Sequence, residues 1–252
     1  MYDLRSGEFR STITRPEAAA DEIAFVRIEA DGAVPLGGRS AVLASEFPVE
    51  TSSVDMHFFY VAAYECTQAQ WRLICDLAGM PEAAEPWSAY PETVIARGDD
   101  RAAAGVSLDL VQEVLAAYND RVRGWSDLAL PSDVQWEVAG RAGAVGTDLN
   151  FGDFQRDAEG LVMPPTGASM RRHAHVAESN DGEIGPFAVG QLEPTAADVL
   201  DLHGNVWEIT SDAHLRGGSW RDPCIQATLA NRVTVVADQP HPLAGIRFVM
   251  DF

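Results

Sequence analysis

One stretch constrains the fold of this chain more than any other, residues 201–220, which read DLHGNVWEITSDAHLRGGSW. It contains two glycine-centred turns, Gly204-Asn205 and Gly217-Gly218, which flank short apolar and aromatic runs. Turns of this kind need backbone dihedral angles that favour glycine. The segment therefore predicts short, tightly folded β-strands joined by turns.

Two acidic side chains, Asp201 and Glu208, flank the first of these turns. Because side chains alternate between the faces of a strand, we expect Val206 and Glu208 on one side and Trp207 on the other. The two carboxylates, with the carbonyls of the turn between them, could close on one hard cation, and ligation by oxygen alone suits calcium. The alternative is that both carboxylates only cap backbone amides of the turn.

The charge balance limits the partners. The 252 residues include 18 Lys and Arg against 38 Asp and Glu, for a net charge of −20. Nucleic acid and anionic membranes both attract basic patches, so we expect no nucleic-acid partner and no membrane insertion. With 46% hydrophobic residues, the chain can bury a full core as one large domain or at most two. The acidic excess suits cation sites, or it only keeps the protein soluble.

The cysteines Cys66, Cys75 and Cys224 are scattered, and no CxxC pair occurs. This pattern supports neither a zinc knuckle nor a disulfide framework. The first residues show no apolar core region and no cleavage site, so we expect no signal peptide. No apolar run reaches the length of a membrane span. The sequence therefore predicts a cytoplasmic or virion-associated protein without a transmembrane segment.

The order of turns and periodic segments predicts one loop-rich domain. Residues 1–22 are polar and alanine-rich and predict an N-terminal arm, and residues 23–252 predict a single domain. The expected elements are strands at residues 23–28 and 56–62, a helix at 68–77 capped by Thr67, a helix at 108–122, and a helix capped by Ser132 with Gln135 as its capping-box partner.

Six motifs follow one another along the chain: YECTQAQW (64–71), LPSDVQWEVAGRAG (130–143), NFGD (150–153), DLHGNVWE (201–208), LRGGSW (215–220) and GIRFV (245–249). In this order they resemble the formylglycine-generating enzyme family, the sulfatase-modifying-factor domain, which is a variant of the C-type-lectin-like fold. The resemblance spans nearly the whole chain from about Ile23. It implies an α+β, loop-rich single domain whose core is sealed by the motif tryptophans Trp71, Trp136, Trp207 and Trp220.

The chain departs from this family where copper would bind. Members that form formylglycine hold copper with two cysteine thiolates, the first two residues beyond the aromatic of the GGS-aromatic motif and the second five residues later. Here those positions are Asp222 and Ala227. Cu(I) needs soft sulfur, which a carboxylate and a methyl group cannot supply. Cys224 is out of register and is interpreted as a small, half-buried thiol. We therefore expect no copper and no formylglycine-forming activity.

The resemblance also implies a calcium site beside the GNxWE turn. Carried over position by position, its ligands are the side chain of Asp201, the carbonyls of Gly204 and Val206, and the carboxylate of Glu208. Calcium is therefore the expected cofactor. A second calcium site of some relatives is not expected, because residues 179–187, SNDGEIGPF, match its loop poorly.

Two functions of different classes stay open. The first is a non-catalytic module that binds a ligand or partner, such as a receptor-binding or display protein, with a protein or glycan ligand and a place in a larger assembly. The second is an enzyme with altered, non-copper chemistry that matures or oxidises a peptide or small molecule. We favour the first, because no nucleophile–base pair or redox metal site can be assembled from the sequence, and so no catalytic residue is assigned. Either function would use Trp220, Arg221, Asp222, Asn231, Arg232 and His241, which lie in or beside the segment that varies in display relatives of this fold.

Overall fold

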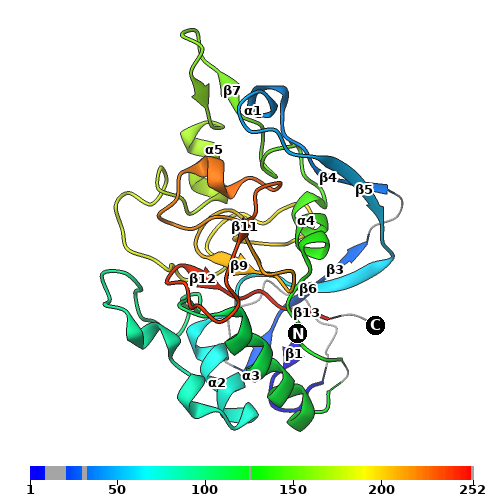
Figure 1. Cartoon of the computed structure of the whole chain (residues 1–252), viewed down its shortest axis with the longest axis vertical. Coiled ribbons are helices and arrows are strands. Elements are labelled where there is room, and N and C mark those ends of the chain that lie inside the picture. The colour runs from blue at the N-terminus through cyan, green and yellow to red at the C-terminus, as the bar shows by residue number, and fades with distance from the viewer. Residues whose placement is uncertain (9–20, 30–32, 125, 251–252) are drawn as a thin grey trace.

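The computed structural model describes residues 1–8, 21–29, 33–124 and 126–250 (Figure 1). Helices and short strands are interleaved with long loops in a single domain, as the α+β prediction required. The helices α2 and α3 lie side by side at one end of the molecule, and the strand β7 lies near the opposite end (Figure 1). Among the described residues, none of the helices has both the length and the apolar character that crossing a membrane requires.

The central sheet has four strands in the order β11-β10-β9-β12. The segment that the sequence singled out supplies its two inner strands, which pair antiparallel with each other, and β12 then joins β9 in parallel. The strands β11 and β12 are therefore opposite edges of this sheet. The bounds are β9 (Trp207–Ile209), β10 (His214–Arg216), β11 (Val233–Thr234) and β12 (Ala244–Gly245).

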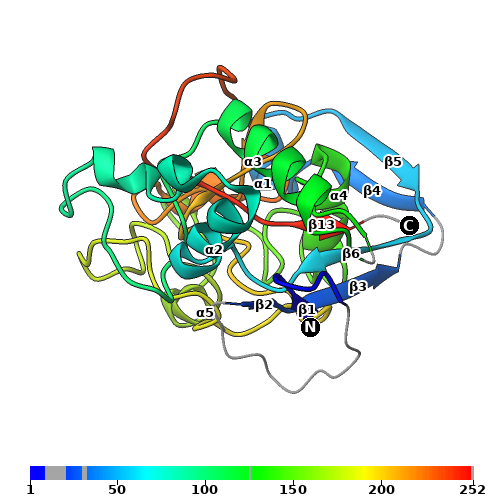
Figure 2. The ribbon, with the colours of Figure 1, turned by 90° about the horizontal axis from the view of Figure 1, so that it is seen from below.

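A three-stranded sheet in the order β13-β6-β3 packs beside the central one, and three two-stranded pairs complete the β-structure. Figure 2 shows β1, β2 and β3 together near the N-terminus. The strands predicted at residues 23–28 and 56–62 are confirmed as β3 and β6, which pair antiparallel. The bounds are β3 (Phe25–Glu29), β6 (Phe58–Ala62) and β13 (Val249–Met250), and the pairs are β1 (Tyr2–Asp3) with β2 (Glu22–Ile23), β4 (Ala33–Gly37) with β5 (Thr51–Asp55), and β7 (Gln155–Arg156) with β8 (Val162–Met163).

Two helices begin directly after the capping residues predicted from the sequence. The hydroxyls of Thr67 and Ser132 each accept a hydrogen bond from the backbone amide three residues on. In both cases the side-chain oxygen of the glutamine at that position accepts a hydrogen bond from the backbone amide of the capping residue. These reciprocal bonds satisfy amides that the first helical turn leaves free. The helices are α1 (Ala41–Ala44), α2 (Gln68–Ala78), α3 (Leu108–Arg121), α4 (Asp133–Arg141) and α5 (Gly167–His173), with 3-10 turns η1 (Pro81–Ala83), η2 (Pro86–Ala89) and η3 (Cys224–Ala227).

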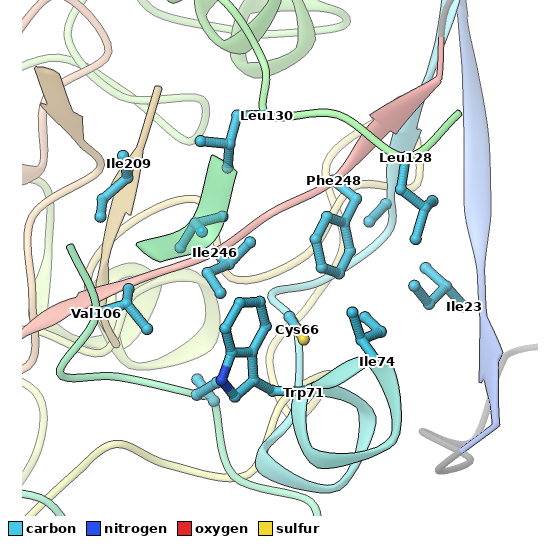
Figure 3. Packing of buried hydrophobic residues seen from close by; sticks show 14 of the residues in the cluster. Ile23, Cys66, Trp71, Ile74, Val106, Leu128, Leu130, Ile209, Ile246 and Phe248 are labelled. Atoms are coloured by element: carbon cyan, nitrogen blue, oxygen red, sulfur yellow. The ribbon is translucent and has the colours of Figure 1, made fainter. Parts of the chain in front are cut away.

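The core is apolar and contains the motif tryptophans. Trp71 is fully buried on α2 and lies among Ile74, Ile246 and Phe248 (Figure 3). The other three are also buried, which confirms the prediction that these residues seal the core. The exposed fractions of Trp71, Trp136, Trp207 and Trp220 are 0%, 1%, 5% and 7%.

The described part of the predicted N-terminal arm packs against the domain. Tyr2 and Leu4 are both fully buried, and the hydroxyl of Tyr118 on α3 donates to the carbonyl of Leu4 at 2.7 Å. Residues 9–20, which make up most of the predicted arm, lie outside the described residues. The boundary at residue 22 therefore stays a prediction.

Candidate functional site

Asp222 lies where the chain leaves the GGSW turn beside β9. Its Oδ2 accepts a hydrogen bond from the indole nitrogen of Trp207 at 2.8 Å and a second one from the hydroxyl of Ser219. The Ser219 hydroxyl also accepts from the amide of Arg221 at 3.3 Å. Asp222 therefore holds the turn together through two neutral donors, at the position that the resemblance assigns to the first copper thiolate.

Trp220 anchors this turn in the protein interior. Its amide donates to the carbonyl of Asn205 at 3.0 Å, and its own carbonyl accepts from the side chain of Asn180 at 2.6 Å. The ring lies so close to Gly185 that a Cβ there would be 2.7 Å from its Cδ1. Arg221, the next residue, is exposed, with its guanidinium carbon 5.6 Å from the Trp220 ring centroid. The buried ring thus fixes the place of an exposed arginine.

His241 completes this group. It is half-buried in the segment before β12, and the amide of Leu243 donates to its Nδ1 at 3.3 Å. Burial lowers the pKa of the imidazole, and the negative charge of Asp222 opposes that shift. Four of the six predicted site residues, Trp220, Arg221, Asp222 and His241, therefore lie in one neighbourhood.

The other two predicted site residues lie elsewhere. Asn231 and Arg232 precede β11, the sheet edge opposite to the one that His241 precedes. Strands in a sheet are about 4.8 Å apart, so the two edges of this sheet are separated by about 14 Å. Asn231 bonds to Gln226, at 2.8 Å to the carbonyl and 3.0 Å to the side-chain oxygen, and Arg232 is exposed. The six residues do not form one lining.

The position that the resemblance assigns to the second copper thiolate holds Ala227, and the thiol of the nearby Cys224 is buried. Ala227 is fully buried, and a Cβ on Gly218 (φ +76°) would be 3.0 Å from its Cα, so this contact is tight. The carbonyl of Ala227 lies 2.7 Å from Nδ1 of His203. Cys224 is fully buried rather than half-buried, and burial together with the negative charge of Glu178 raises the pKa of its thiol to about 12. Cys224 is therefore protonated at neutral pH and a poor ligand or nucleophile.

Glu208 of β9 forms a buried ion pair with Arg247. Glu208 is fully buried; its Oε1 accepts from Nη2 of Arg247 at 2.7 Å, and its Oε2 accepts from Nε of Arg247 at 2.8 Å and from the indole of Trp136 at 2.6 Å. The same guanidinium donates to the carbonyls of Ala62 and Leu200, each at 2.9 Å. In this arrangement both oxygens of Glu208 have partners.

Two further carboxylates share this interior and are not fully bonded. Oδ2 of Asp201 accepts from the amide of Gly190, but Oδ1 is buried without a hydrogen-bond partner. Glu65 is fully buried, and neither of its carboxylate oxygens has a partner. Burial raises the pKa of Asp201 to about 6 and that of Glu65 well above its usual value, where the charge of Asp201 adds to the shift. Three carboxylates, with Glu208, thus face the single charge of Arg247.

The unpartnered oxygens of Asp201 and Glu65 fit the chemistry of a hard cation, which takes carboxylate oxygens and would offset the excess charge. The described residues include no group of three His, Cys, Asp or Glu side chains arranged around one metal position. Two of the four predicted ligands, at Gly204 and Val206, are main-chain carbonyls, which belong to no such group. Calcium binding stays a prediction. Glu65 was missed by the sequence reasoning, although a carboxylate three residues after the end of an apolar strand was a signal for it.

Residues 12–252 match the family model described as the sulfatase-modifying factor enzyme 1-like domain. A formylglycine-generating enzyme of Mycobacterium tuberculosis is 33% identical over 100 residues, which cover 39% of this chain and 32% of that enzyme. One of Streptomyces coelicolor is 29% identical over 93 residues, covering 35% of this chain and 27% of that enzyme. The matched regions thus span about a third or less of the length of these relatives.

Solved structures show the same fold at low sequence identity. Treponema denticola variable protein 1 matches with a TM-score of 0.67 and 13% identity over 90% of this chain and 94% of that one. PvdO from Pseudomonas aeruginosa matches with a TM-score of 0.63 and 19% identity, over 90% and 94% of the two chains. CarF matches with a TM-score of 0.63 and 15% identity, over 92% and 99%. At these identities the likeness concerns the fold.

Proposed function

Because the chain belongs to the sulfatase-modifying factor enzyme 1-like domain family, we propose that it uses this scaffold as a non-catalytic module that binds a protein partner. The observation that carries the proposal is the replacement of both copper thiolates. Asp222 bonds to Trp207 and Ser219, and Ala227 is fully buried. Neither side chain offers the soft sulfur that Cu(I) requires.

The contact surface would centre on Arg221. Arginine and aromatic residues most often anchor protein interfaces, where they are held rigidly. Arg221 follows directly on the buried Trp220 and is exposed, so a partner can reach it without disturbing the core. Its neighbour Asp222 is half-buried and adds a carboxylate to the same surface. The net charge of −20 disfavours nucleic acid, whereas the guanidinium of Arg221 would pair locally with a carboxylate or carbonyl oxygen of the partner.

The location of one cavity also supports binding over catalysis at this surface. An enzyme site is expected in a deep pocket with converging titratable groups. The cavity of about 460 Å³ in this protein is lined by none of the six predicted site residues. Of the four that lie together, Trp220 is buried, Asp222 and His241 are half-buried, and Arg221 is exposed. This composition suits a shallow recognition surface.

We also propose that calcium stabilises the scaffold. Of the two carboxylates predicted from the sequence, Asp201 has a buried oxygen without a partner, whereas both oxygens of Glu208 are bonded to Arg247 and Trp136. Glu65, whose carboxylate oxygens lack partners, would take the place of Glu208 beside the carbonyls of Gly204 and Val206. The ion would neutralise charge that Arg247 alone leaves unbalanced. It would serve stability and not chemistry.

The test of the binding function uses immobilised protein and quantitative mass spectrometry of what it retains from a lysate of its source. Each retained protein is then purified and its affinity measured for the wild type, Arg221→Ala and Arg232→Ala. Arg232 is the matched control, because it is an exposed arginine at the opposite sheet edge. An interface anchor contributes about 2 kcal/mol or more, so Arg221→Ala should weaken the affinity about 30-fold while Arg232→Ala leaves it unchanged. Equal affinities for the wild type and Arg221→Ala would contradict the proposed surface.

A further inference from the structure

The strand β3 is one edge of the sheet β13-β6-β3, and Figure 2 shows it outermost, with β6 between it and β13. Phe25 on β3 lies opposite Ala62 on β6, but the amide of Ala62 donates to the carbonyl of Phe248 instead of to β3. The two residues are therefore a pair without mutual hydrogen bonds. Because such pairs alternate with bonded pairs along an antiparallel ladder, the backbone groups of Phe25 and Arg27 point away from β6.

These outward backbone groups of β3 are free. Among the described residues, neither the N–H nor the carbonyl of Phe25 or Arg27 has a hydrogen-bond partner on this side. Such groups recur every second residue, about 7 Å apart, and another extended backbone matches this spacing. Natural proteins usually cover or block an edge of this kind. The free edge thus indicates a place where a further strand can be added.

The charged side chains of β3 do not block its edge. The guanidinium carbon of Arg27 lies 4.2 Å from the ring centroid of Phe58 and the same group pairs with Glu29. Phe58 belongs to β6 and lies opposite Glu29 in the sheet. The arginine therefore folds over the neighbouring strand of its own sheet and leaves the outer edge of β3 open to another backbone.

Two recesses border β3, one toward each end of the strand. The larger has a volume of about 460 Å³ and is mostly apolar, with Phe25, Val26, Pro194 and Leu200 in its lining. The smaller has a volume of about 210 Å³ and is lined by Arg27, Glu29, His57 and Phe58. Phe25 and Glu29 are about 13 Å apart along an extended strand. Side chains on one face of an added strand can therefore reach both recesses.

The charge of the protein favours a basic segment at this edge. Asp198 lines the larger recess, is exposed, and forms no ion pair within the part of the chain that the structure describes. A lysine or arginine of an added strand would pair with it. The net charge of −20 attracts a basic segment and opposes the edge-to-edge pairing of two copies of this chain.

We propose that β3 binds an extended, basic segment of a partner protein as an additional strand. The backbone of the segment bonds to Phe25 and Arg27, an apolar side chain fills the larger recess, and a basic side chain pairs with Asp198. This surface is separate from the one around Arg221, because none of the residues proposed there lines either recess. Either proposal can therefore fail without the other.

The test begins with random nonapeptides displayed on phage and selected on the immobilised protein. Enriched peptides are synthesised, and their affinities are measured by fluorescence polarisation. They should combine an apolar residue with a lysine or arginine. Successive amides of a strand point to opposite edges, so N-methylation of one alternating set should weaken binding more than tenfold. N-methylation of the other set is the matched control and should leave the affinity unchanged.

Hydrogen exchange then locates the bound peptide. The amides of Phe25 and Arg27 should exchange at least tenfold more slowly with saturating peptide, whereas the amide of Val26, which faces β6, should be protected with and without it.

Variants of the protein test the side-chain contacts. Pro194→Trp fills the larger recess from an exposed position and should weaken binding at least tenfold, whereas Val233→Trp, at an exposed position on β11, should not. Asp198 has a φ of 58°, which asparagine tolerates, and Asp198→Asn should weaken binding about two- to fivefold. Arg221→Ala should leave peptide binding unchanged. Circular dichroism confirms that each variant is folded.

Four outcomes overturn the proposal. Selection enriches no peptide, both methylated sets bind as tightly as the unmodified peptide, or the amides of Phe25 and Arg27 keep their exchange rates with saturating peptide. The fourth is a dimer in sedimentation experiments that protects these amides without peptide, which would assign the edge to a second copy of the chain.

Discussion

Two tryptophan–carboxylate hydrogen bonds involve residues of β9, and they differ in how deeply the carboxylate is buried. Trp136 donates to Glu208 at 2.6 Å, and Trp207 donates to Asp222 at 2.8 Å. Glu208 is fully buried and paired with Arg247, whereas Asp222 is half-buried and held by neutral donors. Trp207 and Glu208 are consecutive on the strand, so their side chains point to opposite faces. One strand thus connects a charged interior to the surface proposed for recognition.

This difference in burial distinguishes contacts that the fold requires from contacts that can change without loss of the fold. The Glu208–Arg247 pair joins β9 to the carbonyls of Ala62 and Leu200, which are distant in sequence. Its loss would disconnect several segments at once. The side chain of Asp222 bonds to Ser219 within the turn and to Trp207, at the position that the resemblance assigns to the first copper thiolate. We therefore expect substitutions in the interior to change stability, and those at the surface to change function.

The largest effect is expected for Arg247→Met. The substitution replaces the guanidinium with a shorter, uncharged and unbranched side chain, and it leaves the carboxylates of Glu208, Asp201 and Glu65 buried without a cation. Removal of one partner of a buried pair costs about 3–5 kcal/mol, a large part of a typical free energy of unfolding. Urea denaturation measures this loss, with Arg221→Met as the control at an exposed arginine. A loss below about 1 kcal/mol would show that the pair does not hold the interior together.

The pH dependence of stability sharpens the picture of the same interior. The folded pKa of Asp201 is about 6, above the ordinary value near 3.9 that the unfolded chain has. A carboxyl with a raised folded pKa stabilises the fold when it is protonated, and this stabilisation is lost as the pH rises through 6. Without calcium, the wild type should therefore gain roughly 1–3 kcal/mol relative to Asp201→Asn between pH 7 and pH 4. A difference that does not change with pH would contradict the raised pKa.

At neutral pH, calcium should reverse the effect of Asp201→Asn on the stability of the protein. A bound cation stabilises the ionised form of Asp201, so the wild type should then be more stable than Asp201→Asn at pH 7, and Glu65→Gln should behave in the same way. Thermal melting in calcium and in chelator measures this. Calcium and chelator should give different melting temperatures in the wild type and nearly equal ones in Asp201→Asn. Metal analysis that finds no calcium, together with unchanged melting in chelator, would rule out the site.

The smallest losses of stability are expected when the indole N–H donors of Trp136 and Trp207 are removed. Trp136→Phe removes the N–H that Glu208 accepts inside the core and should cost about 1–3 kcal/mol. Trp207→Phe removes a similar ring volume and the N–H on the half-buried Asp222, where water can replace the lost bond, so it should cost about 1 kcal/mol less than Trp136→Phe. Equal losses in denaturation experiments would show that the two contacts do not differ as the burial of their carboxylates implies.

Local chemistry made part of the fold predictable from the sequence. The caps at Thr67 and Ser132 act over three residues, so the starts of α2 and α4 follow directly from the sequence. The motif tryptophans were predictable as core residues because the motif order resembled a known family. Helix α3 begins at the predicted Leu108 and ends one residue before the predicted Val122, a difference within the usual fraying of helix ends.

Long-range geometry explains what the sequence did not reveal. The strand order β11-β10-β9-β12 separates Asn231 and Arg232 from His241, and no local pattern encodes that order. The partner of Glu208 is Arg247, 39 residues along the chain. Glu65 faces Asp201 only because distant motifs meet in the core. The contacts that make up these sites are therefore visible only in the folded chain.

The most direct test of the central claim is a copper and oxidation assay of the purified protein. The protein is loaded with Cu(I) and incubated with oxygen and a sulfatase-type peptide that contains the substrate cysteine, beside a formylglycine-generating enzyme as positive control. With Asp222 and Ala227 in the thiolate positions, we expect no stoichiometric copper binding and no conversion of the peptide. Stoichiometric copper binding or peptide oxidation that Cys224→Ser abolishes would contradict the account, because it would give the buried thiol a catalytic role.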